Sequence, residues 1–202
     1  MKGLLRKDYY LIQSSLFTMF VVFVIAGAGI TFLSTAWVLC VIASSLSAII
    51  STTTITMDKT SGWRKVSCTL PLNRKAAIDS KYVLNLLLGG AGFLLGGTLS
   101  IVLALLQGQF DLYDMLVYFS ISITMVLLSA SVAIPCAFVL SEEKSTIVTI
   151  LVYPLSALVF AAASLLFRNK AAVFGAMVLL ASAAYAISWL MTRKRIAYQE
   201  IT

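Results

Sequence analysis

The sequence contains no histidine, and only 11% of its 202 residues are charged. Histidine is the commonest metal ligand and the commonest general base, so the usual parts of a metal centre or hydrolytic site are missing. In a soluble domain, about a quarter of the residues are charged. The charged fraction of this chain is less than half of that, so the sequence predicts no soluble domain. The cysteines, Cys40, Cys68 and Cys136, form no C-x-x-C pair, and this favours apolar packing over a disulfide or metal framework.

Charge is also missing over long runs, which predicts an all-α membrane protein. Residues 9–57 contain no Asp, Glu, Lys or Arg. Because a membrane span needs about 20 apolar residues, this run predicts two helices, with the break expected at the small residues 26–29. Each of the other uncharged runs fits one span: 82–110, 115–141, 145–167 and 171–192. The sequence therefore predicts six transmembrane helices in a single domain, residues 1–202, with a first span that is retained rather than cleaved as a signal.

The basic residues predict the orientation of these spans. One side of the membrane would carry Lys2, Arg6, Lys7, Lys59, Arg64, Lys65, Arg74, Lys75, Lys81, Lys144, Arg193, Lys194 and Arg195. The other side would carry only Arg168 and Lys170. Because basic loops stay in the cytoplasm, both termini and segment 57–82 are expected there. The net charge of +7 then predicts contact with anionic membrane lipid and no nucleic-acid partner.

Inside the membrane, the sequence offers packing signals and few charges. Gly92 and Gly96 form G-x-x-x-G, which lets helices approach closely. This motif is compatible with packing inside one bundle, with a contact to a second subunit, or with a surface that slides during transport. The lack of ionisable residues deep in the spans argues against ion-driven transport. Polar residues such as Asn85 and Tyr185 either join helices or line a mildly polar path.

Segment 57–82 is the most informative stretch. As a helix, residues 63–70 would place Trp63, Val66 and Leu70 on one face and leave the basic side chains elsewhere. Asn73 is a plausible N-cap for a second helix, beginning at Arg74, that continues into the third span. From the residues alone, the segment is either a basic surface loop anchored at the membrane or a docking element for a cytoplasmic partner.

The motifs of this segment resemble those of a known family. The pattern acidic-x-x-Ser-Gly-Trp, then Leu-Pro, then Arg and Ser-Lys-Tyr resembles the small permeases of the ABC-2 exporter superfamily. The matching residues are Asp58, Ser61, Gly62, Trp63, Leu70, Pro71, Arg74, Ser80, Lys81 and Tyr82. The N-terminal L-x-x-K-D at residues 4–8 is similar to the amphipathic N-terminal segment of that family. Helix number and length extend the resemblance over the whole chain, and one similar branch exports the phenol-soluble modulin peptides.

The resemblance implies a six-helix, type V exporter-like permease fold and a mechanism. Two permease subunits, expected to be a homodimer, would each bind one ABC ATP-binding subunit in a bacterial plasma membrane. Segment 57–82 would act as the coupling loop, with contacts from Asp58, Ser61, Gly62, Trp63, Arg64, Lys65, Leu70, Pro71 and Arg74. The chain itself would have no catalytic residue, metal or cofactor, since the partner would bind ATP and magnesium. The substrate would be hydrophobic or amphipathic, an exported peptide being one example. The short outer segment 168–170 departs from family members with large external segments.

Two other functions remain open at this point. A membrane scaffold or immunity protein would bind a partner without transporting anything. An intramembrane enzyme would need a Ser-His pair, paired Asp residues or a metal site, and the spans contain none of these. Neither the substrate nor the choice between homodimer and heterodimer follows from the residues.

Overall fold

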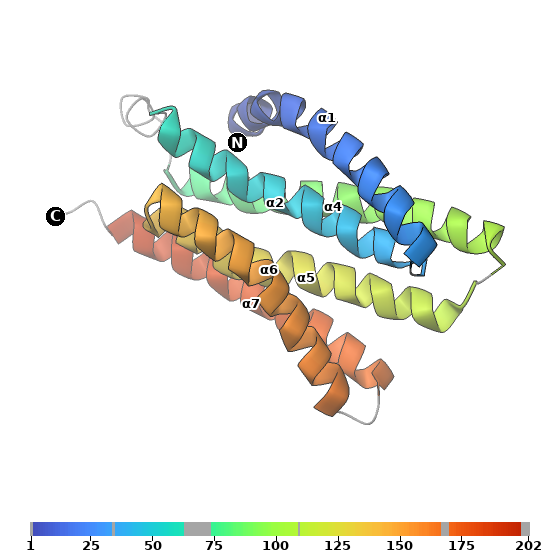
Figure 1. Cartoon of the computed structure of the whole chain (residues 1–202). Helices are drawn as coiled ribbons and strands as arrows, with labels where there is room; N and C mark the ends of the chain where they lie inside the picture. Colours follow the sequence, from blue (N-terminus) through green and yellow to red (C-terminus); the bar gives the residue numbers. More distant parts are fainter. Residues whose placement is uncertain (1, 34, 63–73, 109, 167–169, 199–202) are drawn as a thin grey trace.

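The computed structural model describes residues 2–33, 35–62, 74–108, 110–166 and 170–198, and every regular element in these ranges is an α-helix (Figure 1). The helices are α1 (Lys2–Leu33), α2 (Val38–Thr60), α4 (Arg74–Leu106), α5 (Leu112–Val139), α6 (Glu142–Leu166) and α7 (Lys170–Tyr198). The prediction of an all-α protein is confirmed.

The helices have the length and composition of membrane spans. Among the described residues, five helices are long and apolar enough to cross a membrane: α2, α4, α5, α6 and α7. In α1, the segments Gly3–Gln13 and Leu16–Ile25 are bent by 51° relative to each other, and they make a sixth span if they are taken together. The chain is therefore a multi-pass membrane protein.

The expected break between the first two spans is wrong. Helix α1 passes through residues 26–29 and ends at Leu33, and the chain turns just before Val38. In hydrocarbon, each backbone polar group must be satisfied within the segment, so small residues inside a span continue the helix instead of opening a turn. The turn contains the bond from the amide of Val38 to the carbonyl of Thr35, 3.2 Å long.

Helix α4 confirms a second expectation. It runs without interruption from Arg74 through Lys81 and Tyr82 to Leu106, so the end of segment 57–82 and the third span are one rigid element. The predicted N-cap Asn73 and the predicted helix 63–70 lie outside the described residues.

The helices differ in how far they are buried. Over their most apolar windows, 56% of α2 and 50% of α5 is buried, against 17% of α6 and 11% of α7. Helices α2 and α5 therefore form the centre of the bundle. Large apolar side chains remain exposed on the outer helices, for example Leu94 on α4, Leu158 on α6 and Leu179 on α7. These faces suit contact with lipid chains or a second subunit.

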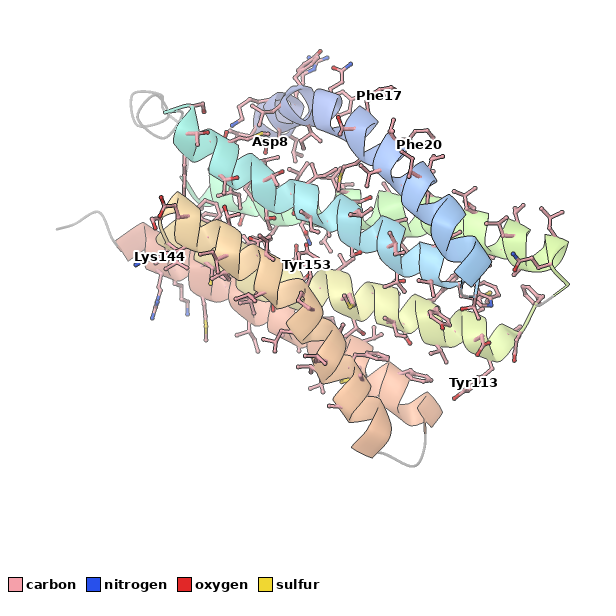
Figure 2. All side chains as sticks on the ribbon, in the orientation of Figure 1. Asp8, Phe17, Phe20, Tyr113, Lys144 and Tyr153 are labelled. Atoms are coloured by element: carbon pink, nitrogen blue, oxygen red, sulfur yellow. The ribbon has the colours of Figure 1, made fainter. Side chains whose placement is uncertain are left out.

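The two ends of the bundle are arranged differently (Figure 1). At the end where α2 stops and α4 starts, called the loop end below, α4 also meets α7. Toward the opposite end, α4 and α7 separate widely. Figure 2 shows Asp8 and Lys144 at the loop end and Tyr113 at the opposite end.

Candidate functional site

The loop end contains a buried ionic cluster centred on Lys81 of α4. Its ammonium group lies 2.9 Å from Asp8 Oδ1 of α1 and 2.7 Å from Asp58 Oδ2 of α2. It also donates to Thr54 Oγ1 of α2 at 3.1 Å. A lysine has three N–H donors, and each of them has a partner here. Lys81 therefore joins α1, α2 and α4 at one point.

A second lysine balances the charge of this cluster. Lys7 pairs with Asp58 Oδ1 and lies 3.4 Å from Asp8 Oδ1, so two lysines meet two aspartates. The Asp8 side chain is 1% exposed and that of Lys81 is 7% exposed. At such burial, an isolated charge costs several kcal/mol, and removing one partner of a pair is strongly destabilising. The neutral balance is what allows these groups to sit inside the protein.

One atom of the cluster lacks a partner. Asp8 Oδ2 is buried, and none of the described residues forms a hydrogen bond with it. Its carboxylate therefore depends on the contacts that Lys81 and Lys7 make with Oδ1. This makes Asp8 the member of the cluster that is most sensitive to loss of a lysine.

The local sequence explains how α2 ends beside this cluster. Gly62 has a φ of +68°, a left-handed conformation that glycine adopts without a Cβ penalty. The amide of Gly62 donates to the carbonyl of Lys59, and that of Ser61 donates to the carbonyl of Met57. A glycine of this kind is a common helix stop, and it ends α2 one turn after Asp58.

A second group of contacts joins α4 to α7. The indole N–H of Trp189 donates to Asp79 Oδ1 at 2.7 Å. The guanidinium of Arg193 lies 3.8 Å from Asp79 Oδ2, and its central carbon lies 5.6 Å from the centre of the Trp189 ring. Asp79 stands two residues before Lys81, so the first turns of α4 carry both sets of contacts.

The hydroxyl of Tyr82 strengthens the contact between α4 and α7. It lies 2.9 Å from Ser188 Oγ and 3.0 Å from Thr192 Oγ1. Tyr185 donates its hydroxyl to the backbone carbonyl of Tyr82 at 2.7 Å, and the two rings meet edge to face. Beneath these polar groups lies an apolar cluster that includes Ile55, Tyr82 and Tyr185.

A third contact brings in the turn between α5 and α6. The ammonium of Lys59, at the end of α2, donates to the carbonyl of Leu140 at 2.6 Å. Leu140 is the C-cap residue of α5, where a helix leaves carbonyls without intrahelical donors. The ends of α1, α2, α4, α5 and α7 are thus joined around the base of segment 57–82.

A comparison with known protein families gives the family of the chain. A model of the ABC-2 family transporter protein matches residues 3–196 of the chain. The chain belongs to the ABC-2 transporter family. Membrane proteins of this family are generally non-catalytic and generally work with an ABC ATP-binding subunit. No curated protein and no solved structure matches the chain.

In this ABC-2 protein, the residues expected to contact an ATP-binding subunit fall into two groups. Trp63, Arg64, Lys65, Leu70 and Pro71 lie outside the described residues. The others lie at the helix ends around them: Asp58 and Ser61 at the end of α2, Gly62 after it, and Arg74 at the start of α4. Ser61 is exposed, whereas Asp58 is buried in the ionic cluster. The carboxylate of Asp58 therefore holds the base of the segment together.

The glycine motif of α4 lies against α2. A Cβ on Gly92 would come within 2.5 Å of the Ala43 carbonyl oxygen, and one on Gly96 would lie 2.9 Å from Cys40 Cα. The absence of a side chain thus lets two backbones touch inside one subunit. Polar groups act in the same region, since Ser51 of α2 donates to Asn85 Oδ1 of α4 at 2.7 Å.

Sequence reasoning missed how the motif residues combine. Lys7, Asp8 and Lys81 are all part of the resemblance, yet the pairing of the two lysines with Asp8 and Asp58 becomes visible only when the helices are assembled. A signal was present: Asp8 is the only acidic residue before position 58. A lone carboxylate at the edge of a membrane span generally finds a buried partner. No comparable signal pointed to Asp79 and Trp189, which are 110 positions apart.

The described residues also limit the chemistry of the site. Within them, no group of three or more His, Cys, Asp or Glu could hold a metal ion. A groove of about 200 Å³ lies between α4 and α5, and its lining, which includes Phe93, Val126 and Leu127, is almost wholly apolar. The arrangement therefore suits mechanical connection between helices and contact with apolar groups.

Proposed function

We propose that this chain is the permease subunit of an ATP-driven ABC exporter. It forms the translocation path for a hydrophobic or amphipathic substrate, an exported peptide being one candidate. It has no ATPase activity of its own, and a separate ATP-binding subunit supplies ATP, magnesium and hydrolysis. The functional complex contains two permease subunits, as a homodimer, and two ATP-binding subunits in a bacterial plasma membrane.

The orientation follows from the distribution of basic residues. Thirteen of the fifteen lysines and arginines fall on the side of the loop end and the termini, and two fall on the other side. Since basic segments stay inside, segment 57–82 and both termini are cytoplasmic. The loop end is then the end that an ATP-binding subunit can reach.

The ionic cluster around Lys81 is the observation that carries this proposal. It ties together the two helices that enter and leave segment 57–82, and it adds α1 to them. A partner that displaces the segment therefore displaces three helices as one unit. A passive anchor at the lipid surface would need no such neutralised, buried base. Membership of the ABC-2 family supplies the class of partner.

The test is binding and transport with Trp63→Ala, using the ATP-binding subunit that co-purifies with the chain. If the indole is buried in the partner, the change should weaken binding by about 2 kcal/mol, roughly 30-fold, because aromatic anchors dominate many interfaces. Replacing Arg64 and Lys65 with Ala should weaken binding less and reduce its salt dependence.

Tyr113→Ala serves as the matched control. It removes an aromatic side chain that is about half exposed at the opposite end of the bundle, and it should leave binding unchanged. Equal binding by the Trp63→Ala and Tyr113→Ala proteins would remove segment 57–82 from the interface. A partner that binds without any ATP-dependent transport would instead identify the chain as a membrane scaffold.

A further inference from the structure

We infer that α7 is a fourth helix moved by segment 57–82, in addition to α1, α2 and α4, and that Asp79 and Trp189 are the positioning residues that transmit the movement. This inference rests on the proposed function, because it requires an ATP-binding subunit that displaces the segment. Movement of the segment would pass from the first turns of α4 to α7 through Asp79 and Trp189. This connection acts in addition to the one from Lys81 to α1 and α2.

The first turns of α4 contact α1 and α2 on one side and α7 on the other. Asp79 and Lys81 are two residues apart, which places them about 200° apart around a helix of 3.6 residues per turn. The contacts follow this geometry: Lys81 reaches Asp8 and Asp58, whereas Asp79 reaches Trp189. Any rotation or shift of this part of α4 therefore changes both its contacts with α1 and α2 and its contact with α7.

The contact with α7 is specific and directional. The bond from the Trp189 indole to the Asp79 carboxylate is 2.7 Å long and charge-assisted, a class about twice as strong as a neutral hydrogen bond. The ion pair between Arg193 and Asp79 is longer, at 3.8 Å, and the Arg193 side chain is 39% exposed. Exposed ion pairs add little stability, so this pair contributes little to holding α4 and α7 together. The indole and the carboxylate thus make the charge-assisted connection, which acts beside the hydrogen bonds of the Tyr82 hydroxyl to Ser188 and Thr192.

The contact lies at one end of both helices, which gives it the position of a pivot. The polar contacts of Asp79 and Tyr82 with α7 reach residues between 185 and 193, at the loop end of both helices. Toward the other end the two helices separate, and α7 packs on α6 through Met177 and Phe160 (Figure 1). A tilt at Trp189 therefore becomes a larger displacement at the far end of α7.

The size of this displacement follows from helix geometry. About 20 Å of helix separates Trp189 from Ala176, at 1.5 Å per residue. A tilt of about 10°, somewhat smaller than known rigid-body rotations between subunits, moves position 176 on the order of 3 Å. Leu99 on α4 and Ala176 on α7 are both exposed, so spin labels can be placed at both sites.

The test measures the distance between these labels in the reconstituted complex with the ATP-binding subunit. The three native cysteines are replaced, and Leu99 and Ala176 are changed to Cys. Distance distributions are recorded without nucleotide and with ATP and vanadate. We expect a nucleotide-dependent shift on the order of 3 Å in the otherwise unmodified protein.

Four variants are compared on this background. Trp189→Phe keeps an aromatic ring and removes the N–H donor, and Asp79→Ala removes the acceptor. Both should lose at least half of the shift while the ATP-binding subunit binds as before. Asp79→Asn keeps an acceptor and should retain the shift. Trp37→Phe makes the matched change at a buried tryptophan near the opposite end, and it should also retain the shift.

The outcomes separate this inference from the proposed function. If the unmodified chain binds no ATP-binding subunit, both are overturned. If it binds one and shows the shift, but Trp189→Phe and Asp79→Ala leave the shift intact, only the inference is overturned. Loss of the shift in Trp37→Phe or Asp79→Asn, to the same degree as in Asp79→Ala, also overturns it, because the effect would then follow from general destabilisation.

Discussion

Replacement of Lys81 tests whether the ionic cluster holds the base of segment 57–82 together. Lys81→Met keeps most of the side-chain volume and removes the charge. Asp8, at 1% exposure, would lose its nearer lysine and keep only Lys7 at 3.4 Å. Breaking a buried pair from one side costs about 3–5 kcal/mol. Because Lys7 remains and also pairs with Asp58, we expect the lower end, about 3 kcal/mol.

A loss of about 3 kcal/mol is on the order of a 100-fold change in the unfolding equilibrium. It can be measured by unfolding the purified protein with dodecyl sulfate in mixed micelles and following tryptophan fluorescence. Lys75→Met is the matched control, since Lys75 stands in the same helix with an exposed side chain. Exposed substitutions of this kind usually change stability by less than about 0.5 kcal/mol.

The double variant Asp8→Asn with Lys81→Met sharpens the test. Removal of both charges leaves no unpaired carboxylate at position 8, so the double variant should be about 1–2 kcal/mol more stable than the sum of the single changes predicts. The reasoning is refuted if Lys81→Met is no more harmful than Lys75→Met, or if the two single effects simply add.

Two further predictions concern packing and orientation. Gly96→Ala should destabilise the protein, because the new Cβ would lie 2.9 Å from Cys40 Cα, whereas a Cβ at Gly90 meets nothing within 4 Å, so Gly90→Ala should be tolerated. The same dodecyl sulfate titration compares the unfolding midpoints of the two variants, and equal midpoints would contradict the packing of α4 on α2. In a background without native cysteines, Asn169→Cys should react with a membrane-impermeant maleimide in intact cells and Thr60→Cys should not, and the reverse pattern would overturn the orientation.

The helices themselves were largely predictable from the sequence. Uncharged runs of about 20 or more residues are a strong signal, because water is absent from the bilayer core and only closed backbone hydrogen bonding is possible there. The failure at residues 26–29 has the same origin. Small residues open turns readily in water, but in a span they leave the helical ladder intact, and α1 continues to Leu33.

The site was only partly predictable. The charged segment 57–82 stands out by contrast with its flanks, and its motif identified the family. The pairing of Asp8 and Asp58 with Lys81 depends on three helix ends arriving at one place, and no local period encodes that. The same holds for Asp79 and Trp189, whose contact depends on how α7 crosses α4. For the Lys81 cluster, the sequence property that could have predicted the pairing is the balance of charge between helix ends that lie far apart in the chain.

The order of synthesis gives the Lys81 cluster a consequence for biogenesis. Asp8 and Asp58 lie on α1 and α2, which leave the ribosome first, whereas Lys81 follows on α4. Until α4 has been made, Lys7 is the one lysine of the cluster that is present, and it faces both Asp8 and Asp58. A buried charge without a partner is costly in an apolar environment. The buried charges of the first two helices therefore reach their final balance only after Lys81 has been synthesised.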